Sequence, residues 1–320
     1  MNVWRKAAPL LLLAAVFVSL SGCGTGGGRE VEAGDRVLAV TALYPLAFLA
    51  EEIGGERAQV VNLVPTGVEP HDWSPGSRDL VTISRARLFI YNGAGFEGWV
   101  GDVLDAVAGD DGPLPVKASE GIPLIRASGE ETEHGGDDGH EHGGDRPDVD
   151  PHVWVSPKSA RIMADNILAA FLTVDPEGRA HYEARHAALA ERLRELDERY
   201  ARELAALPRR DIVVSHAAFG YLCRDYGLNQ VAVMGLASDA EPRAQDLLAV
   251  KRLVEERGVK AIFFEELVSD RLARVLARET GAEVLPLNPL EGLTPQQQKD
   301  GENYLTLMER NLEQLKRALG

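Results

Sequence analysis

Short apolar runs alternate with amphipathic stretches along most of this chain. In the first half the runs predict strands at 37–41, 58–64 and 88–91, and the stretches predict helices at 43–53, 78–85 and 96–108. The alternation restarts later, with strands expected at 212–215, 230–234, 261–264 and 283–287 and helices at 218–226, 242–257, 271–280 and 295–319. Such alternation predicts parallel sheets covered by helices. We therefore expect an α/β fold of two lobes, each with a mostly parallel sheet.

One long stretch without an internal break separates the two halves. Residues 176–207 are rich in Ala, Glu, Arg and Leu, with leucines at helical spacing. Asp175 is suited to cap the start of a helix, and Pro208 to stop it. About 30 residues at 1.5 Å each span roughly 45 Å, the size of a domain. We expect a rigid helix that joins an N-terminal lobe, 36–175, to a C-terminal lobe, 208–320.

The first 35 residues have the pattern of an export signal followed by a tether. Arg5 and Lys6 precede a short apolar run that ends in small residues, which is typical of a signal peptide over 1–22. Leu-Ser-Gly-Cys at its end resembles the bacterial lipobox, and this resemblance implies that Cys23 is acylated. The alternatives are a signal anchor or ordinary cleavage. A Gly-rich tether, 23–35, follows, so we expect an extracytoplasmic protein that lipid anchors to the cell membrane.

Composition narrows the function classes. Hydrophobic residues make up 45% and charged residues 26% of the chain, which excludes wholesale disorder. Lys and Arg number 34 against 50 Asp and Glu, for a net charge of −16. A surface this acidic repels phosphate backbones, so nucleic acid is not an expected partner. Two cysteines cannot make a disulfide framework.

The segment 129–150 differs from the rest of the chain. It is dense in carboxylates, carries His134, His140 and His142, and has almost no apolar residue that could enter a core. Histidine-rich tracts of this kind are a compositional sign of metal binding. We expect a mobile loop that gathers metal weakly. The alternative is a solvated acidic insertion without a role.

Three other histidines lie where an α/β fold places its ligands. His71 follows the second predicted strand, His216 directly follows the strand at 212–215, and His152 comes just before a helix. In open α/β sheets, ligands bind beyond the carboxyl ends of the strands. A fourth group from 287–292, after the last strand, would complete a metal site.

Five motifs carry a family resemblance over about residues 36–320. They are Gly67-Val-Glu-Pro-His71-Asp, Asp150-Pro-His152-Val-Trp, Ser215-His216-Ala-Ala-Phe-Gly-Tyr221, Phe263-Phe-Glu265-Glu266 and Leu287-Asn-Pro-Leu-Glu291-Gly-Leu-Thr. The chain resembles the metal-binding solute-binding lipoproteins of bacterial zinc and manganese ABC importers, the ZnuA/TroA-like family. The resemblance implies two α/β lobes joined by one long helix, with a single metal ion in the cleft between them.

The resemblance also implies the ligands. His71, His152 and His216 match the family's three histidine positions. Manganese-type members have a carboxylate where His216 stands, and the acidic histidine-rich insertion is typical of zinc members. Glu291 is the expected fourth ligand, with Asn288 or a water molecule as the alternative.

Two further carboxylates, Glu69 and Glu265, rank behind Glu291 as ligands. Asp72 or Glu69 could instead orient a ligand histidine.

Coordination chemistry points to the same metal. Three imidazoles and one carboxylate suit tetrahedral Zn²⁺ better than Mn²⁺, which prefers more oxygen ligands. We expect a monomeric protein, not an enzyme, that captures Zn²⁺ and delivers it to the membrane permease of an ABC importer. The alternatives are a manganese- or iron-binding member of the family and a surface adhesin lipoprotein. A metallohydrolase is disfavoured because the chain has no H-E-x-x-H motif.

Overall fold

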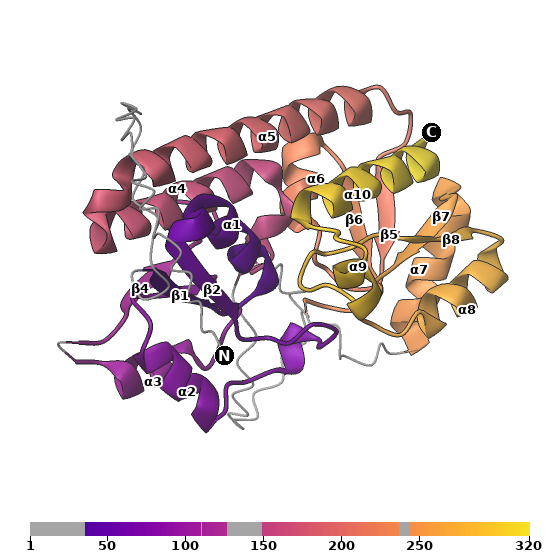
Figure 1. Cartoon of the computed structure of the whole chain (residues 1–320). Coiled ribbons are helices and arrows are strands. Elements are labelled where there is room, and N and C mark those ends of the chain that lie inside the picture. The colour runs from indigo at the N-terminus through magenta and orange to yellow at the C-terminus, as the bar shows by residue number, and fades with distance from the viewer. Residues whose placement is uncertain (1–35, 110, 127–148, 237–243) are drawn as a thin grey trace, which may run out of the picture.

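Two four-stranded parallel sheets organise the molecule (Figure 1). The computed structural model describes residues 36–109, 111–126, 149–236 and 244–320. The sheets have the orders β2-β1-β3-β4 and β6-β5-β7-β8, and every strand pair is parallel. The predicted fold class, two α/β lobes with parallel sheets, is therefore confirmed.

The N-terminal lobe has helices on both faces of its sheet. Its strands are β1 (Val37–Thr41), β2 (Ala58–Asn62), β3 (Leu88–Tyr91) and β4 (Leu114–Lys117). Its helices are α1 (Tyr44–Gly54), α2 (Ser77–Ser84), α3 (Val100–Val107) and α4 (Pro157–Val174). Ala39 and Ile90 belong to the core cluster of α1 and α4, whereas Val40 and Phe89 pack with α2 and α3. Successive residues of a strand point to opposite faces, so strands covered on both faces need continuous apolar runs.

The C-terminal lobe repeats this arrangement. Its strands are β5 (Asp211–Val214), β6 (Asn229–Ala232), β7 (Ala261–Phe264) and β8 (Glu283–Pro286). Its helices are α6 (Gly220–Tyr226), α7 (Ala244–Arg257), α8 (Arg271–Thr280), α9 (Pro295–Lys299) and α10 (Tyr304–Leu319). Val213 and Ile262 pack with α7 and α8, whereas Ile212 and Phe263 face the cluster that includes α6 and α10.

The long helix α5 (Arg179–Ala205) runs across both lobes (Figure 1). Its 27 residues span about 40 Å. It packs against α1 and α4 of one lobe and α6 and α10 of the other. Its buried stripe recurs every three, four or seven residues and consists of Tyr182, Leu189, Leu193, Leu196, Tyr200 and Leu204. One hydrophobic cluster therefore continues through both lobes.

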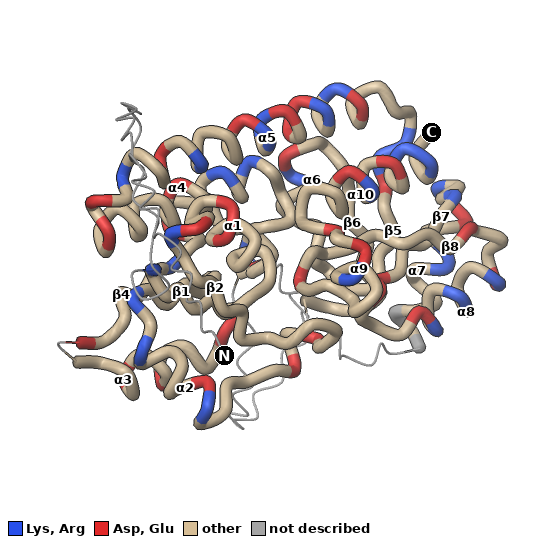
Figure 2. The backbone as a smooth tube through the Cα atoms, in the orientation of Figure 1, with Lys and Arg blue, Asp and Glu red and all other residues tan. Residues whose placement is uncertain are grey.

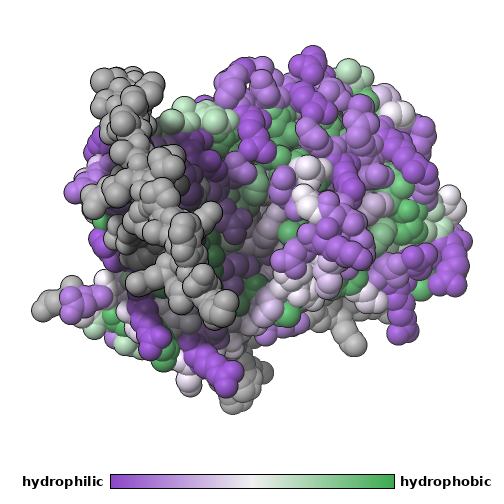
Figure 3. All heavy atoms as spheres, viewed as in Figure 1, coloured by the Kyte–Doolittle hydropathy of each residue, from purple (hydrophilic) through white to green (hydrophobic). Residues whose placement is uncertain are grey.

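The outer face of α5 is charged and hydrophilic. Acidic and basic residues are interspersed along it (Figure 2), with i,i+4 ion pairs such as Arg179–Glu183. The space-filling view shows hydrophilic residues over this edge of the molecule (Figure 3). A polar outer face and an apolar inner stripe are what a helix at the surface of two lobes requires.

The structure corrects the bounds of the long helix. Pro176–Gly178 form a 3₁₀ turn before α5, so the helix begins at Arg179 and not at 176. The Asp175 side chain accepts a hydrogen bond from the Gly178 N–H and turns the chain out of α4. At its other end α5 stops at Ala205, two residues before the predicted end.

The single helix predicted at 295–319 is wrong, because the structure has two helices there. α9 ends at Lys299, and Gly301 has a φ of 72°, a left-handed conformation that interrupts a helix. Asn303 then caps α10 by accepting hydrogen bonds from the Leu305 and Thr306 N–H groups.

The edge strand β4 was not predicted from the sequence. Only Val116 of its four residues is buried, so the segment has no apolar run. Within the residues that the structure describes, no helix has both the length and the apolar character needed to cross a membrane.

Candidate metal centre

Four residues from distant parts of the sequence meet between the two sheets. His71 lies in a 3₁₀ turn, Pro70–Asp72, beyond β2, and His216 comes two residues after β5. Glu291 follows β8, and His152 immediately precedes a short 3₁₀ helix, Val153–Val155. Parallel strands place their carboxyl ends at one edge of a sheet, which explains why His71, His216 and Glu291 lie at such edges; His152 comes instead from the segment before α4.

The ligand atoms of these four residues all lie within 4.8 Å of one another. Glu291 Oε1 is 3.3 Å from His71 Nε2, 3.3 Å from His152 Nε2 and 3.4 Å from His216 Nε2. The Nε2 atoms of His71 and His152 are 3.2 Å apart. In a tetrahedron the distance between two ligands is about 1.6 times the metal–ligand bond, so zinc bonds of 2.0–2.1 Å require ligand separations of about 3.3–3.4 Å. The three distances from Glu291 Oε1 and the distance between His71 and His152 are close to that requirement.

This cluster is almost completely buried. The side chains of His152 and His216 are 0% exposed and Glu291 is 1% exposed, while His71 is 11% exposed. His216 Nε2 and Glu291 Oε1 have no hydrogen-bond partner within the described part of the chain. Burial of unpartnered polar atoms is costly, and a bound cation would remove that cost.

The charges within the cluster favour a cation at its centre. Burial by itself raises the pKa of the Glu291 carboxyl, but the three facing imidazoles hold it well below its ordinary value. Burial lowers the pKa of His216, yet the carboxylates of Glu265 and Glu291 outweigh burial and raise it to about 10. The pKa of His152 is also raised, because Asp150 and Glu291 outweigh its burial. Positive charge is therefore stabilised here, whether a proton or a metal ion carries it.

Two carboxylates hold the buried imidazole rings in place. Asp150 Oδ1 is 2.8 Å from His152 Nδ1 and accepts a hydrogen bond from the His152 N–H at 2.9 Å. Glu265 Oε2 is 2.6 Å from His216 Nδ1, and its Oε1 accepts from the His216 N–H at 3.1 Å. In both cases the carboxylate occupies Nδ1, which leaves Nε2 for the centre of the cluster.

The orienting roles of Asp150 and Glu265 were not predicted from the sequence. Asp72 and Glu69 were the predicted orienting residues. The Asp72 side chain is exposed. Among the described residues, Glu69 accepts a hydrogen bond only from the His71 backbone N–H, at 3.3 Å. The position of Asp150, two residues before the candidate ligand His152, could have indicated that it orients this histidine. Glu265 lies at the end of another strand, so only the sheet order β5-β7 brings it to His216.

Asn288, the alternative to Glu291, lies outside the cluster. Its side-chain nitrogen donates to Glu266 at 2.8 Å, and its side-chain oxygen accepts from the Leu290 N–H at 2.7 Å. Leu290 has a φ of 66°, an uncommon value for a residue with a branched side chain. Asn288 thus supports the strained turn that presents Glu291.

Several predicted residues lie outside the described part of the chain: Cys23, His134, His140 and His142. The two ends of the histidine-rich segment are described. Arg126 and Val149 form an isolated antiparallel bridge, and the Asp150 N–H donates to the Ile125 carbonyl at 2.8 Å. The residues that flank the segment therefore lie side by side, and Val149 is three residues before His152.

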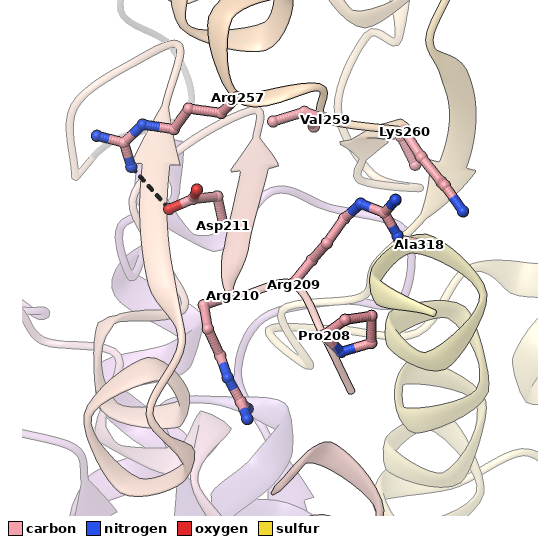
Figure 4. Close-up of a pocket in the computed structure, with 9 residues that line it drawn as sticks. Pro208, Arg209, Arg210, Asp211, Arg257, Val259, Lys260 and Ala318 are labelled. Atoms are coloured by element: carbon pink, nitrogen blue, oxygen red, sulfur yellow. Dashed lines mark hydrogen bonds and ion pairs between the residues drawn. The ribbon is translucent and has the colours of Figure 1, made fainter. Parts of the chain in front are cut away.

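A basic pocket lies at the opposite ends of the C-terminal strands (Figure 4). Its cations are Arg209, Arg210, Arg257 and Lys260. Arg210 donates to the carbonyls of Leu204 and Ala205. Arg209 and Lys260 both donate to the Gly320 oxygen. Arg257 pairs with the Asp211 carboxylate. Cations at helix carbonyl ends stabilise those ends, so this pocket secures the ends of α5 and α10 and supplies no metal ligands.

Two α/β lobes with a buried histidine and carboxylate cluster between them define the chain as a metal-binding protein of the solute-binding class. The sequence profile of the ZnuA family, described as the periplasmic component A of the zinc-uptake complex, matches residues 39–318. The chain belongs to this family, as the sequence motifs predicted.

Named relatives agree with this assignment. The chain is 36% identical over 321 residues to the high-affinity zinc uptake system protein ZnuA of Bacillus subtilis, and the match covers 99% of both proteins. It is also 36% identical to the zinc-binding protein AdcA of Streptococcus pyogenes, where the match covers 90% of this chain but 57% of AdcA. The chain thus corresponds to little more than half of AdcA.

Solved structures show the same fold. The Zn(II)-bound ZnuA-like domain of Streptococcus pneumoniae AdcA matches with a TM-score of 0.75 and 34% identity, over 89% of this chain and 99% of that domain. The laminin-binding protein Lmb of Streptococcus agalactiae, described as having adhesin and metal-transporting activity, matches with a TM-score of 0.77 and 27% identity, over 89% of this chain and 100% of Lmb.

Proposed function

We propose that this protein captures Zn²⁺ outside the cytoplasmic membrane and delivers it to the permease of an ABC importer. In this proposal His71, His152, His216 and Glu291 are the four ligands. The observation that carries it is the convergence of three imidazole Nε2 atoms on Glu291 Oε1 at 3.3–3.4 Å. Membership of the zinc-uptake family supports the same assignment.

Zinc fits this donor set better than manganese. Zn²⁺ accepts nitrogen and oxygen ligands in a tetrahedron, whereas sites for Mn²⁺ use mainly oxygen ligands. The intrinsic order of affinities favours Cu²⁺ over Zn²⁺, so selectivity depends on the geometry of the site and on metal supply.

The same geometry argues for transport and against catalysis. A catalytic zinc keeps one coordination position for water or substrate. In this proposal four protein ligands would fill the four positions of a tetrahedral zinc ion and leave none for water or substrate. We therefore propose a binding protein and not an enzyme.

Location and partners follow from the same proposal. Residues 1–22 would be a signal peptide, Cys23 the acylated residue and 23–35 a tether. The chain would act as a monomer in which the lobes 36–175 and 208–320 are joined by the helical segment 176–207. Size-exclusion chromatography with light scattering tests the monomer, and mass spectrometry of the membrane-extracted protein tests lipidation.

A surface adhesin is a second candidate, because Lmb shares the fold over nearly its whole length. Binding of the purified protein to immobilised laminin, with and without a chelator, tests it. Absence of saturable binding would remove this candidate and leave zinc capture untouched.

Metal analysis of the purified protein is the decisive experiment. We expect one tightly held zinc per chain in the wild type and its loss in His152→Ala, since His152 is fully buried at the cluster. His186→Ala is the matched control, because this histidine of α5 bonds to Asp165 of α4, away from the cluster, and the variant should retain zinc. Stoichiometric tight zinc in His152→Ala would remove that residue from the site.

A further inference from the structure

The turn that presents Glu291 has an uncommon backbone. Leu290, directly before Glu291, has a φ of 66°, and its side chain is fully buried in the hydrophobic cluster that continues through both lobes. Left-handed backbone is unfavourable for a residue with a Cβ atom, so it persists only where the surrounding structure holds it. The position of the Glu291 carboxylate therefore depends on the groups that fix the turn 288–291.

One buried side chain of α10 holds the first residue of this turn by both of its backbone groups. Asn311 Oδ1 accepts a hydrogen bond from the Asn288 N–H at 2.8 Å, and Asn311 Nδ2 donates to the Asn288 carbonyl at 2.7 Å. One residue earlier, the Leu287 N–H still donates to the carbonyl of Phe264, the last residue of β7. At Asn288 the amide of Asn311 thus takes the place of the neighbouring strand. Asn311 is 4% exposed, so water does not compete for these bonds.

The side chain of Asn288 holds the turn from within. Its oxygen accepts a hydrogen bond from the Leu290 N–H at 2.7 Å, and its nitrogen donates to Glu266 at 2.8 Å. Glu266 Oε2 also accepts from Gln297 Nε2 of α9, at 2.6 Å. Asn288 therefore bonds through its backbone to α10 and through its side chain to the residue that has the left-handed backbone.

A further bond reaches the turn from the segment that contains His152. Trp154 Nε1 donates to the Pro289 carbonyl at 2.8 Å, and the Trp154 side chain is fully buried. Side chains thereby satisfy four backbone polar groups of residues 288–290. Buried backbone groups need such partners, and these partners exist without an ion. The turn is therefore held in one position before metal binds.

A fixed turn also determines how the Glu291 carboxylate faces the ion. All three imidazoles pair with the same oxygen, Oε1, at 3.3–3.4 Å. One carboxylate oxygen and three imidazole nitrogens give four donors, whereas a carboxylate that turns and offers both oxygens gives five. Zn²⁺ favours four ligands, and Mn²⁺ favours more ligands and more oxygen among them.

We propose that Asn311 is a positioning residue that sets the metal specificity of the site. It holds Asn288, and through Asn288 the turn at Leu290, so that Glu291 presents a single oxygen to the ion. The site thereby keeps four donors and favours Zn²⁺ over Mn²⁺. This inference rests on the proposed function, because it concerns how one of the four proposed ligands is held.

Replacement of Asn311 by alanine tests the proposal. Asn311→Ala removes both bonds to Asn288 and lets the Glu291 carboxylate turn. Zinc affinity, measured by chelator competition, should fall roughly 10–100-fold, the usual effect of losing a residue that supports a ligand. The affinity for Mn²⁺ should fall less, so the ratio of the two affinities decreases. The visible absorption of bound Co²⁺, intense for four-coordinate and weak for six-coordinate cobalt, should lose intensity.

Asn303→Ala is the matched control, because Asn303 caps the same helix through the Leu305 and Thr306 N–H groups. Loss of this cap should lower the melting temperature, but the ratio of zinc to manganese affinity and the cobalt spectrum should stay those of the wild type. Equal changes in Asn303→Ala and Asn311→Ala would show that the stability of α10 alone is responsible, and the proposal would be wrong. Wild-type selectivity and spectrum in Asn311→Ala would overturn it as well.

Asn311→Asp is a second test that leaves no cavity in the core. It keeps the oxygen that accepts from the Asn288 N–H and replaces the donor to the Asn288 carbonyl. The selectivity and the cobalt spectrum should change in the same direction as in Asn311→Ala, and this variant decides the question if the alanine variant does not fold. A wild-type protein that binds no zinc would refute the proposed function instead, so the two failures are distinguished.

Discussion

One carboxylate oxygen, which faces three imidazoles, determines the charge of the proposed metal site. Glu291 Oε1 is nearly equidistant from the three Nε2 atoms, and it is the one negative charge that a divalent ion would meet directly. The geometry also separates Glu291 from Asn288, whose side chain is committed to Glu266 and Leu290.

Replacement of Glu291 by Gln should weaken zinc binding by more than the roughly 10–100-fold typical of losing an outer hydrogen-bond partner. The reason is that the amide keeps the shape but removes the charge that faces the ion. Competition with a chromophoric chelator measures the effect. Glu120→Gln, on the surface, is the control. Equal affinities for Glu291→Gln and wild type would reassign the fourth ligand.

Acid should release the ion. Imidazoles bind zinc only when neutral, and facing carboxylates raise the pKa of His216 to about 10 and also raise that of His152. The metal-free cluster therefore carries protons that zinc must displace, so apparent affinity rises with pH by about tenfold per unit for each proton released. Chelator competition between pH 6 and pH 9 tests the sign, and a flat profile would contradict it.

At the scale of elements, the corner between α4 and α5 sets the course of the long helix. Asp175 Oδ2 accepts hydrogen bonds from Arg57 and from the Tyr182 hydroxyl, at 2.7 Å each. Burial raises the pKa of this carboxyl, but Tyr182 and Arg57 outweigh burial and lower it below its ordinary value. The charged form is therefore the one that stabilises the corner.

Asp175→Asn should lower the free energy of unfolding at neutral pH by about 1.5–3 kcal/mol, the usual contribution of hydrogen bonds to a charged group. Because the folded pKa lies below the unfolded one, the stabilisation is present above about pH 4 and is lost as pH falls through the folded pKa. Urea denaturation of both proteins at pH 7 and pH 3 measures this. A difference that persists unchanged at pH 3 would contradict the role of the charge.

For the whole molecule, zinc and folding should be linked. A ligand that binds only the folded state at 1,000 times its Kd adds about 4 kcal/mol to the free energy of unfolding. We expect a chelator to lower the melting temperature by several degrees. Glu291→Gln should show a smaller shift. Identical melting curves with and without chelator would be inconsistent with a tight site.

Removal of residues 129–148 should leave the tight site intact. Arg126 and Val149 already pair, so a short connection can close the gap without disturbing Asp150 or His152. Titration calorimetry should retain the tight zinc equivalent and lose only weaker ones. If the tight equivalent vanished, the histidine-rich segment would have to take part in the site.

Local pattern alone determined the α/β class, the two halves and nearly every strand, because strands covered on both faces need apolar runs that stand out from amphipathic helices. Local pattern also pointed to His71, His152 and His216, whereas the choice of Glu291 came from motifs that resemble a known family. Only the tertiary structure brought these four together and revealed Asp150 and Glu265 as their supports. Glu265 reaches His216 because β5 and β7 are neighbours, and sheet order is a long-range property that no local pattern carries. The hydrogen bond from Trp154 Nε1 to the Pro289 carbonyl was likewise decided by tertiary structure, because it joins segments far apart in the chain.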